Sequence, residues 1–172
     1  MRFGRTGPSL GAILLLAIAV AALLGLDLPG GDGDEGIAGR DAEGDVVRVI
    51  DGDTIEVEVG GQTEDVRYIG IDTPESAIPG EPVECFGKEA AAANERLVEG
   101  ERVRLVFDAE RRDHYGRLLA YVYAQGTFVN ADLVKRGFAT TLEIEPNTSR
   151  ADQLGRLEAE AGQEGAGLWS AC

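Results

Sequence analysis

The sequence predicts an α+β domain, with five short strands closing a small β-barrel, three α-helices around it and an N-terminal hydrophobic export segment before it. Two observations predict this class. Short segments with apolar residues at every second position alternate with glycine turns, as antiparallel strands do. Segments with helical spacing interrupt and follow them, which is typical of an α+β domain. Five short strands are also the number that closes a barrel of the OB type.

The first three predicted strands form a meander. Residues 46–50 make the first strand, and residues 54–59 alternate apolar and polar side chains along the second. After a turn at Gly60 and Gly61, residues 65–71 return as the third strand. Antiparallel pairing would bring the start of the second strand beside the end of the third.

A helix is predicted over residues 87–98, where apolar side chains recur at helical spacing before Gly100. Strands over residues 102–107 and 118–123 follow it. The polar residue Asn130 is then a candidate N-cap for a short second helix, and Gly137 is placed to follow its end.

The last predicted helix begins at Ser149. Ser149 and Asp152 have the spacing of a capping box, and the apolar residues that follow share one helical face. Trp169, near the end of the chain, is expected to pack as an anchor in the core.

The N-terminal residues do not resemble a globular domain. Residues 1–28 combine two arginines with an apolar run, which predicts a cleaved signal peptide or an uncleaved membrane anchor through residues 10–26. Both alternatives place the rest of the chain outside the cell, because positive charges stay inside. A buried core helix is the third alternative. Residues 29–44, rich in Gly, Asp and Glu, are expected to form a flexible acidic linker to the domain at residues 45–172.

The chain carries a formal net charge of −15, and arginine supplies most of its 16 basic residues. An acidic, lysine-poor surface favours adaptation to high salt, although an ordinary acidic protein is the alternative. Such a charge excludes binding of nucleic acid over the whole surface, because a polyanion is repelled unless positive groups are concentrated locally. Any nucleic-acid site must therefore be local.

The two cysteines, Cys85 and Cys172, fit an exported chain, in which an even number commonly indicates a disulfide. We expect a bridge between them, and two unpaired thiols are the alternative. No protein partner is predicted, and we expect a monomer.

Two acidic clusters lie at strand ends. Asp53 opens the second predicted strand, and Asp72 closes the third, so antiparallel pairing would bring the two carboxylates together. Carboxylates and backbone carbonyls are the ligands that calcium prefers, and the carbonyl of Thr73 lies beside Asp72. Taken separately, each cluster is equally typical of an ordinary turn.

Two arginines and a glutamate complete a set suited to phosphodiester chemistry. Arg67 and Arg117 are candidate phosphate donors, because a planar guanidinium can make two parallel hydrogen bonds. Glu75 is the candidate base that orients or deprotonates an attacking water. The alternative for Arg67 is that it only neutralises buried carboxylates.

Five segments together resemble the thermonuclease (staphylococcal nuclease-like) family in order and spacing: residues 49–54, Arg67 with residues 71–75, and residues 86–90, 113–123 and 129–130. The resemblance covers about residues 45–170. It implies an OB barrel with three helices and calcium-dependent cleavage of DNA and RNA, both endo- and exonucleolytic, at the 5′ O–P bond, which leaves 3′-phosphates.

The resemblance also implies roles for single residues. Asp53, Asp72 and Thr73 correspond to calcium ligands, Arg67 and Arg117 to phosphate-binding arginines, and Glu75 to the proposed general base. The expected substrates are single-stranded or denatured DNA and RNA.

The chain departs from the family at the substrate side. His114, its only histidine, stands where relatives carry a lysine, and Tyr115 beside it is available for stacking on a base. Both are candidate substrate contacts, although His114 is more simply a surface residue. Residues 140–146 hold aliphatic and acidic side chains where relatives can offer tyrosines. An alternative to an enzyme is a catalytically silent OB module that binds nucleic acid or protein, and another is an exported structural domain with coincidental acidic turns.

Overall fold

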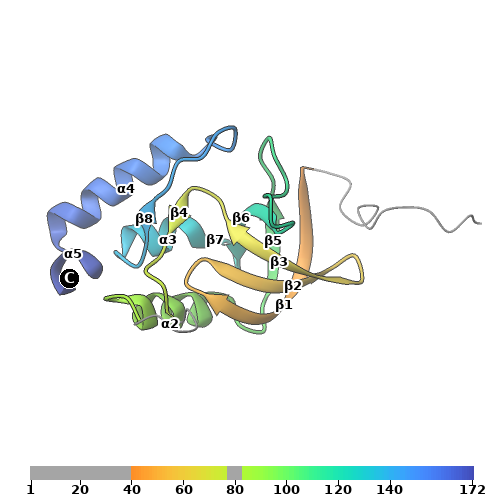
Figure 1. Ribbon diagram of the computed structural model, residues 1–172, viewed down its shortest axis with the longest axis horizontal. Coiled ribbons are helices and arrows are strands. Elements are labelled where there is room, and N and C mark those ends of the chain that lie inside the picture. Colours follow the sequence, from red (N-terminus) through yellow and green to blue (C-terminus); the bar gives the residue numbers. More distant parts are fainter. Residues whose placement is uncertain (1–39, 77–82) are drawn as a thin grey trace, which may run out of the picture. The chain divides into compact units, whose positions relative to one another are not determined.

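A computed structural model describes residues 40–76 and 83–172. Five strands form a closed barrel: β1 (Asp41–Asp51), β2 (Thr54–Val59), β3 (Gln62–Tyr68), β5 (Arg102–Val106) and β6 (Leu118–Ala124). Their order is β3-β2-β1-β5-β6, and a parallel pairing of β3 with β6 closes the ring (Figure 1). The predicted OB-fold barrel is therefore confirmed.

β1 begins earlier than predicted. Its first residues, Asp41 to Gly44, pair with β5, although they fall in the stretch expected to be linker. Gly44 is buried in the strand, where an added Cβ would lie 2.5 Å from Val57 Cγ1. Gly44 was assigned to the flexible linker because of its composition, whereas in the structure its missing side chain permits close packing against β2. Residues 1–39, which include the predicted export segment, lie outside the described residues.

The predicted strand over residues 65–71 is two strands in the structure. β3 ends at Tyr68, and the chain turns at Gly70, whose φ of 79° is unfavourable for other residues. The next pair, β4 (Ile71–Asp72), leaves the barrel and pairs with β8 (Thr140–Thr141). This turn carries Asp72 away from the line of β3.

Three helices pack beside the barrel, as predicted. They are α2 (Gly87–Val98), α3 (Val129–Lys135) and α4 (Ala151–Glu164). α2 packs against β1, whereas α3 packs against both β6 and α4 (Figure 1). A short hairpin strand, β7 (Thr127–Phe128), leads into α3, and a fourth helix, α5 (Leu168–Ala171), was not predicted.

The capping predictions were mostly wrong, because both polar residues bind elsewhere. Asn130 lies inside α3, where its side chain accepts from Val122 N and donates to Ile69 O, both at 2.9 Å. Its buried amide therefore ties the helix to the barrel. Ser149 precedes the N-cap of α4 and makes no capping bond. Gly137 follows α3 with φ 69°, as expected.

The core lies inside the barrel and beneath the helices. Its largest fully buried side chains are Tyr68, Tyr121, Ile55, Ile71, Leu105, Leu118, Leu133 and Leu154. Trp169 is not among them, since 42% of it is exposed, so its predicted role as a core anchor is wrong. Cys85 and Cys172 form a disulfide that joins the segment before α2 to the end of the chain. No helix among the described residues is both long and apolar enough to cross a membrane.

Candidate active site

Asp53 and Arg67 are brought together by the register of β2 and β3. Thr54 lies opposite Arg67 in the pairing, and Tyr68 N donates to Asp53 O at 2.9 Å. The Asp53 side chain then accepts from Arg67 Nη1 at 2.8 Å. The antiparallel pairing that was expected to bring Asp53 to Asp72 thus brings Asp53 to Arg67.

Arg67 holds two carboxylates with one guanidinium. Its Nη1 contacts Asp53 Oδ2, and its Nη2 contacts Asp72 Oδ1 at 2.7 Å. Nη1 also donates to Ile71 O at 3.1 Å. The side chain of Arg67 is mostly buried, whereas the side chain of Asp72 is 55% exposed. Asp53, from the turn before β2, and Asp72, from β4, therefore converge as the sequence predicts, but they do so on Arg67 and not by direct pairing of their strands.

Asp53 is fixed by Thr73 as well. Thr73 N and Oγ1 donate to Asp53 Oδ2 at 2.8 and 3.0 Å. Gly52 permits this contact, because an added Cβ there would lie 2.6 Å from Thr73 Oγ1. Burial raises the pKa of Asp53, and the Arg67 charge and the Thr73 hydrogen bonds oppose that rise without cancelling it.

Glu75 lies at the edge of the same acidic group. A side-chain hydrogen bond with Asp51, followed by burial and repulsion from Asp51, Asp53 and Asp72, raises the pKa of Glu75 to about 7. Its backbone is held by Glu84, which accepts from Glu75 N at 3.0 Å and donates its own N–H to Glu75 O at 3.1 Å. Glu75 can therefore exchange a proton near neutral pH.

Arg117 is presented by a hairpin before β6. Asp113 Oδ2 accepts from Arg117 Nε at 2.7 Å and lies 2.7 Å from Arg117 Nη2. Burial alone would raise the pKa of Asp113, but the hydrogen bonds and charge of Arg117 outweigh it and hold that pKa below its usual value. The guanidinium also lies 5.4 Å from the centre of the Tyr115 ring.

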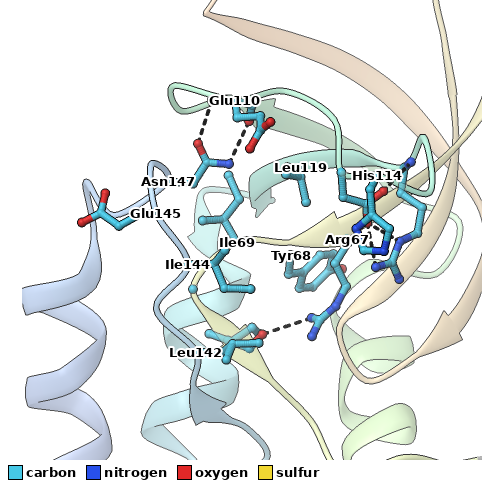
Figure 2. A pocket seen from close by; sticks show the side chains of 14 residues that line it. Arg67, Tyr68, Ile69, Glu110, His114, Leu119, Leu142, Ile144, Glu145 and Asn147 are labelled. Atoms are coloured by element: carbon cyan, nitrogen blue, oxygen red, sulfur yellow. Dashed lines mark hydrogen bonds and ion pairs between the residues drawn. The ribbon is translucent and has the colours of Figure 1, made fainter.

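A cavity of about 470 Å³ joins the two arginines. Arg67 and Arg117 both line it, and so does His114, while Leu142 and Ile144 form the opposite wall (Figure 2). Tyr115 does not line this cavity. It is 74% exposed and stacks at an angle on His114, with ring centres 3.7 Å apart. The sequence-predicted arginines thus share one site, and the aromatic pair stands at its side.

Comparison with known proteins gives the family. Residues 65–171, well over half of the chain, match the family described as staphylococcal nuclease homologue. This chain belongs to the staphylococcal nuclease family. The matched residues include Arg67, Asp72, Glu75 and Arg117, whereas Asp53 precedes them.

Several relatives carry nuclease names. The chain is 38% identical over 160 residues to a thermonuclease of Staphylococcus intermedius, covering 91% of this chain and 95% of the relative. It is 45% identical over 125 residues to the prophage-derived endonuclease YokF of Bacillus subtilis, covering 72% of this chain but 42% of YokF. Against endonuclease YncB of the same species it is 44% identical, covering 72% of this chain and 59% of YncB.

Sequence reasoning missed the residues that brace this staphylococcal nuclease-type site. Buried Asn94 in α2 accepts from Tyr68 Oη and donates to Asp51 O, each at 2.9 Å. Asn147 exchanges two hydrogen bonds of 2.8 Å with the backbone of Glu110 at the cavity rim. Buried amides on apolar segments are the signal that could have found them, because such groups need partners.

The donor set fits a hard cation. Asp53, Asp72 and the carbonyl of Thr73 offer only oxygen. A hydrogen bond with Asp51, then burial, then repulsion from Asp51, Asp53 and Asp72 raise the pKa of Glu75 beside them. Within residues 40–76 and 83–172, no three His, Cys, Asp or Glu side chains form a ready-made metal site. A cation here would therefore need backbone oxygen and water to complete its shell.

Proposed function

We propose that this protein hydrolyses phosphodiester bonds of DNA and RNA with calcium as cofactor. The observation that carries the proposal is the shared cavity, which Arg67 from β3 and Arg117 from the hairpin both line. Asp53 and Asp72 do not line this cavity, but both pair with the guanidinium of Arg67 at its edge. The nuclease names of the relatives support the same reaction. Single-stranded or denatured strands are the proposed substrates.

Asp53, Asp72 and the Thr73 carbonyl are the proposed calcium ligands. When bound, calcium would supply positive charge against the developing charge on the phosphate and would lower the barrier to attack by water. The two carboxylates favour such a cation, because the single positive charge of Arg67 is shared between Asp53 and Asp72. No redox chemistry is required for this role.

The two arginines bind the phosphate. Arg67 can release Asp72 to do so, since that carboxylate is 55% exposed and water can replace the guanidinium as its partner. Arg117 lines the same cavity, and Asp113 holds its Nε. Each guanidinium can then offer parallel donors to the oxygens that gain charge during the reaction.

Glu75 is the proposed general base for the attacking water. Its carboxylate takes a proton as the water oxygen bonds to phosphorus, and the bond from phosphorus to the 5′ oxygen breaks. The leaving 5′ oxygen takes up a proton, and the phosphate stays on the 3′ side. A pKa of about 7 makes Glu75 a stronger base than an ordinary glutamate, with a substantial ionised fraction at neutral pH.

The part of the cavity that would face the bases differs in chemistry from the part that would face the phosphate. Leu142 and Ile144 give the cavity an aliphatic wall, so bases would meet apolar surface rather than an aromatic ring there. His114 at the cavity and exposed Tyr115 beside it are the proposed contacts to the strand. Both endo- and exonucleolytic cleavage are compatible with a cavity that opens to solvent.

The test is cleavage of single-stranded DNA and of RNA with calcium, with EDTA and across a salt series, followed by analysis of product ends. We expect cleavage that requires calcium and leaves 3′-phosphates. Binding of strands without any cleavage would instead identify a silent OB module. Cleavage that persists in EDTA would reject the calcium site.

We further propose that the protein is exported as a monomer, either secreted or anchored to the outer face of the membrane through residues 10–26. The Cys85–Cys172 disulfide supports an oxidising location. Mass spectrometry of the mature N-terminus distinguishes the two, because cleavage removes the apolar run. A full-length chain in the membrane fraction would indicate the anchor.

A further inference from the structure

The hairpin that presents Arg117 is held first by Asp113. Asp113 Oδ1 accepts from Tyr115 N at 2.9 Å and from Arg117 N at 3.0 Å, and Gly116 N donates to Asp113 O at 3.0 Å. These bonds fix the shape of the hairpin tip. They do not fix the tip relative to the strand that carries Arg67.

A second contact joins the hairpin to that strand. Arg112 Nη1 and Nη2 donate to the two carboxylate oxygens of Glu64 in β3, each at 2.9 Å. Arg112 Nη1 also donates to Gly116 O at 2.8 Å. The side chains are 35% and 15% exposed, so solvent screens this two-pronged pair less than it would a surface pair.

The pair lies just outside the stretch in which β3 pairs with β6, although Glu64 itself pairs with Val57 of β2. β3 and β6 begin to pair at Val66 and Leu118, and Arg112 forms an isolated bridge with Leu118. Glu64 therefore reaches the hairpin before the backbone ladder of β3 and β6 starts. One guanidinium thus contacts both β3, which carries Arg67, and the tip that carries Arg117.

We propose that Glu64 and Arg112 are positioning residues that set the separation of the two phosphate-binding arginines. This inference rests on the proposed function. Breaking the pair would free the hairpin to move as a unit around its bridge, while Asp113 still held Arg117 locally. A displacement of about 1 Å at a group that binds the reacting phosphate can cost up to about 100-fold in rate.

The test uses Glu64→Gln and Arg112→Lys in the full chain, with kcat/KM measured on single-stranded DNA. Glu64→Gln removes the negative charge of the pair. Arg112→Lys keeps the positive charge but loses the planar guanidinium that makes two parallel hydrogen bonds. We expect each to lower kcat/KM by about 10-fold, with a thermal midpoint close to that of the parent. Arg102→Gln, which breaks an exposed pair with Glu43, is the matched control and should leave kcat/KM unchanged.

A double-mutant comparison separates positioning from general damage. In an Arg117→Gln background, Glu64→Gln should have almost no further effect, because the group that it positions is gone. An equal loss in both backgrounds would overturn the inference, and so would full activity of Glu64→Gln in the parent.

Hydrogen exchange provides a readout without activity. The amide of Leu119, which donates to Arg111 O at 2.7 Å at the base of the hairpin, should exchange about 10-fold faster in Glu64→Gln than in the parent, and Arg102→Gln should not change it. The amides of Tyr115 and Arg117, which Asp113 holds within the tip, should exchange as in the parent. Unchanged exchange at Leu119 overturns the inference even if the protein cuts no nucleic acid. An inactive parent with faster exchange would reject the proposed reaction and support the contact.

Discussion

Arg67 and Asp53 form a short ion pair, with Nη1 2.8 Å from Oδ2 and both side chains largely buried. Buried charges are stable only when they are paired and hydrogen-bonded, and here Thr73 supplies the further bonds. The same guanidinium reaches exposed Asp72. Arg67 therefore makes a buried structural contact with Asp53 and an exposed contact with Asp72 that a substrate phosphate can replace.

Arg67→Lys should keep the fold and lose most turnover, by about 100-fold. A single ammonium cannot span Asp53 and Asp72 or offer two parallel donors to phosphate. Steady-state cleavage rates with calcium and a thermal melt check both halves. Arg48→Lys, in an exposed pair with Glu56, is the control and should retain its rate. A near-parental rate for Arg67→Lys would remove Arg67 from the chemistry.

Asp53→Ala should lower the free energy of unfolding in calcium-free buffer by about 1 to 3 kcal/mol. It leaves the buried Thr73 amide without its acceptor and part of Arg67 without its partner. Asp53→Asn should cost less, because an amide oxygen can still accept from Thr73. Urea unfolding measures the difference. A gain in stability for Asp53→Ala would mean that repulsion from Asp72 outweighs these bonds.

Asp53 and Asp72 should both contribute to calcium affinity, which calorimetric titration measures. Asn at either position should weaken calcium affinity by at least about 10-fold, since a charged oxygen ligand is lost. Asp132→Asn, on α3 and paired with Arg136, is the matched control and should bind as the parent does. Equal affinity in all variants would exclude the proposed ligands.

Glu75 should make the calcium-free protein less stable as pH rises. Its pKa is about 7 in the folded state against an ordinary value of 4.5, so the folded state binds more protons between these values. The free energy of unfolding therefore falls as pH rises from about 4.5 to 7, and the stabilisation is complete only below that window. Denaturation at several pH values should show this slope reduced in Glu75→Gln. An unchanged slope would contradict the assigned environment.

Removing the disulfide should destabilise the protein strongly. The bridge spans 87 residues, and closing a loop of that length stabilises by about 4 to 5 kcal/mol on the chain-entropy model. Cys85→Ser with Cys172→Ser, compared with the parent by urea unfolding, measures this. A loss below about 1 kcal/mol would show that the unbridged chain is already restrained.

The sequence pattern predicted the barrel and the convergence of Asp53 with Asp72, because strand alternation and the order of the strands place their ends together. Asp53 and Arg67 meet through the pairing of β2 with β3. The helix α2 spans Gly87–Val98, the range predicted from the helical spacing of its apolar residues. Capping was predicted less well. Asn130 and Ser149 have the right chemistry for an N-cap, but their side chains bond tertiary partners instead: the Asn130 amide bonds Val122 N, and the Ser149 hydroxyl bonds Tyr121 Oη.

The bracing contacts could not be read from the sequence for a different reason. Asn94 and Arg112 contact partners 43 and 48 residues away in the sequence, and these partners are fixed only once the barrel has closed. Trp169 shows the reverse error, since a large apolar side chain near a chain end need not be buried. Local sequence patterns thus locate the candidate reactive groups, whereas the residues that hold those groups in place depend on the tertiary fold.

The most direct test is the initial rate of calcium-dependent cleavage of single-stranded DNA by the parent, Arg67→Ala and Arg117→Ala. Two guanidinium groups in one cavity predict that the parent cuts and that each variant loses at least about 100-fold. Rates equal to that of the parent in both variants would contradict the account.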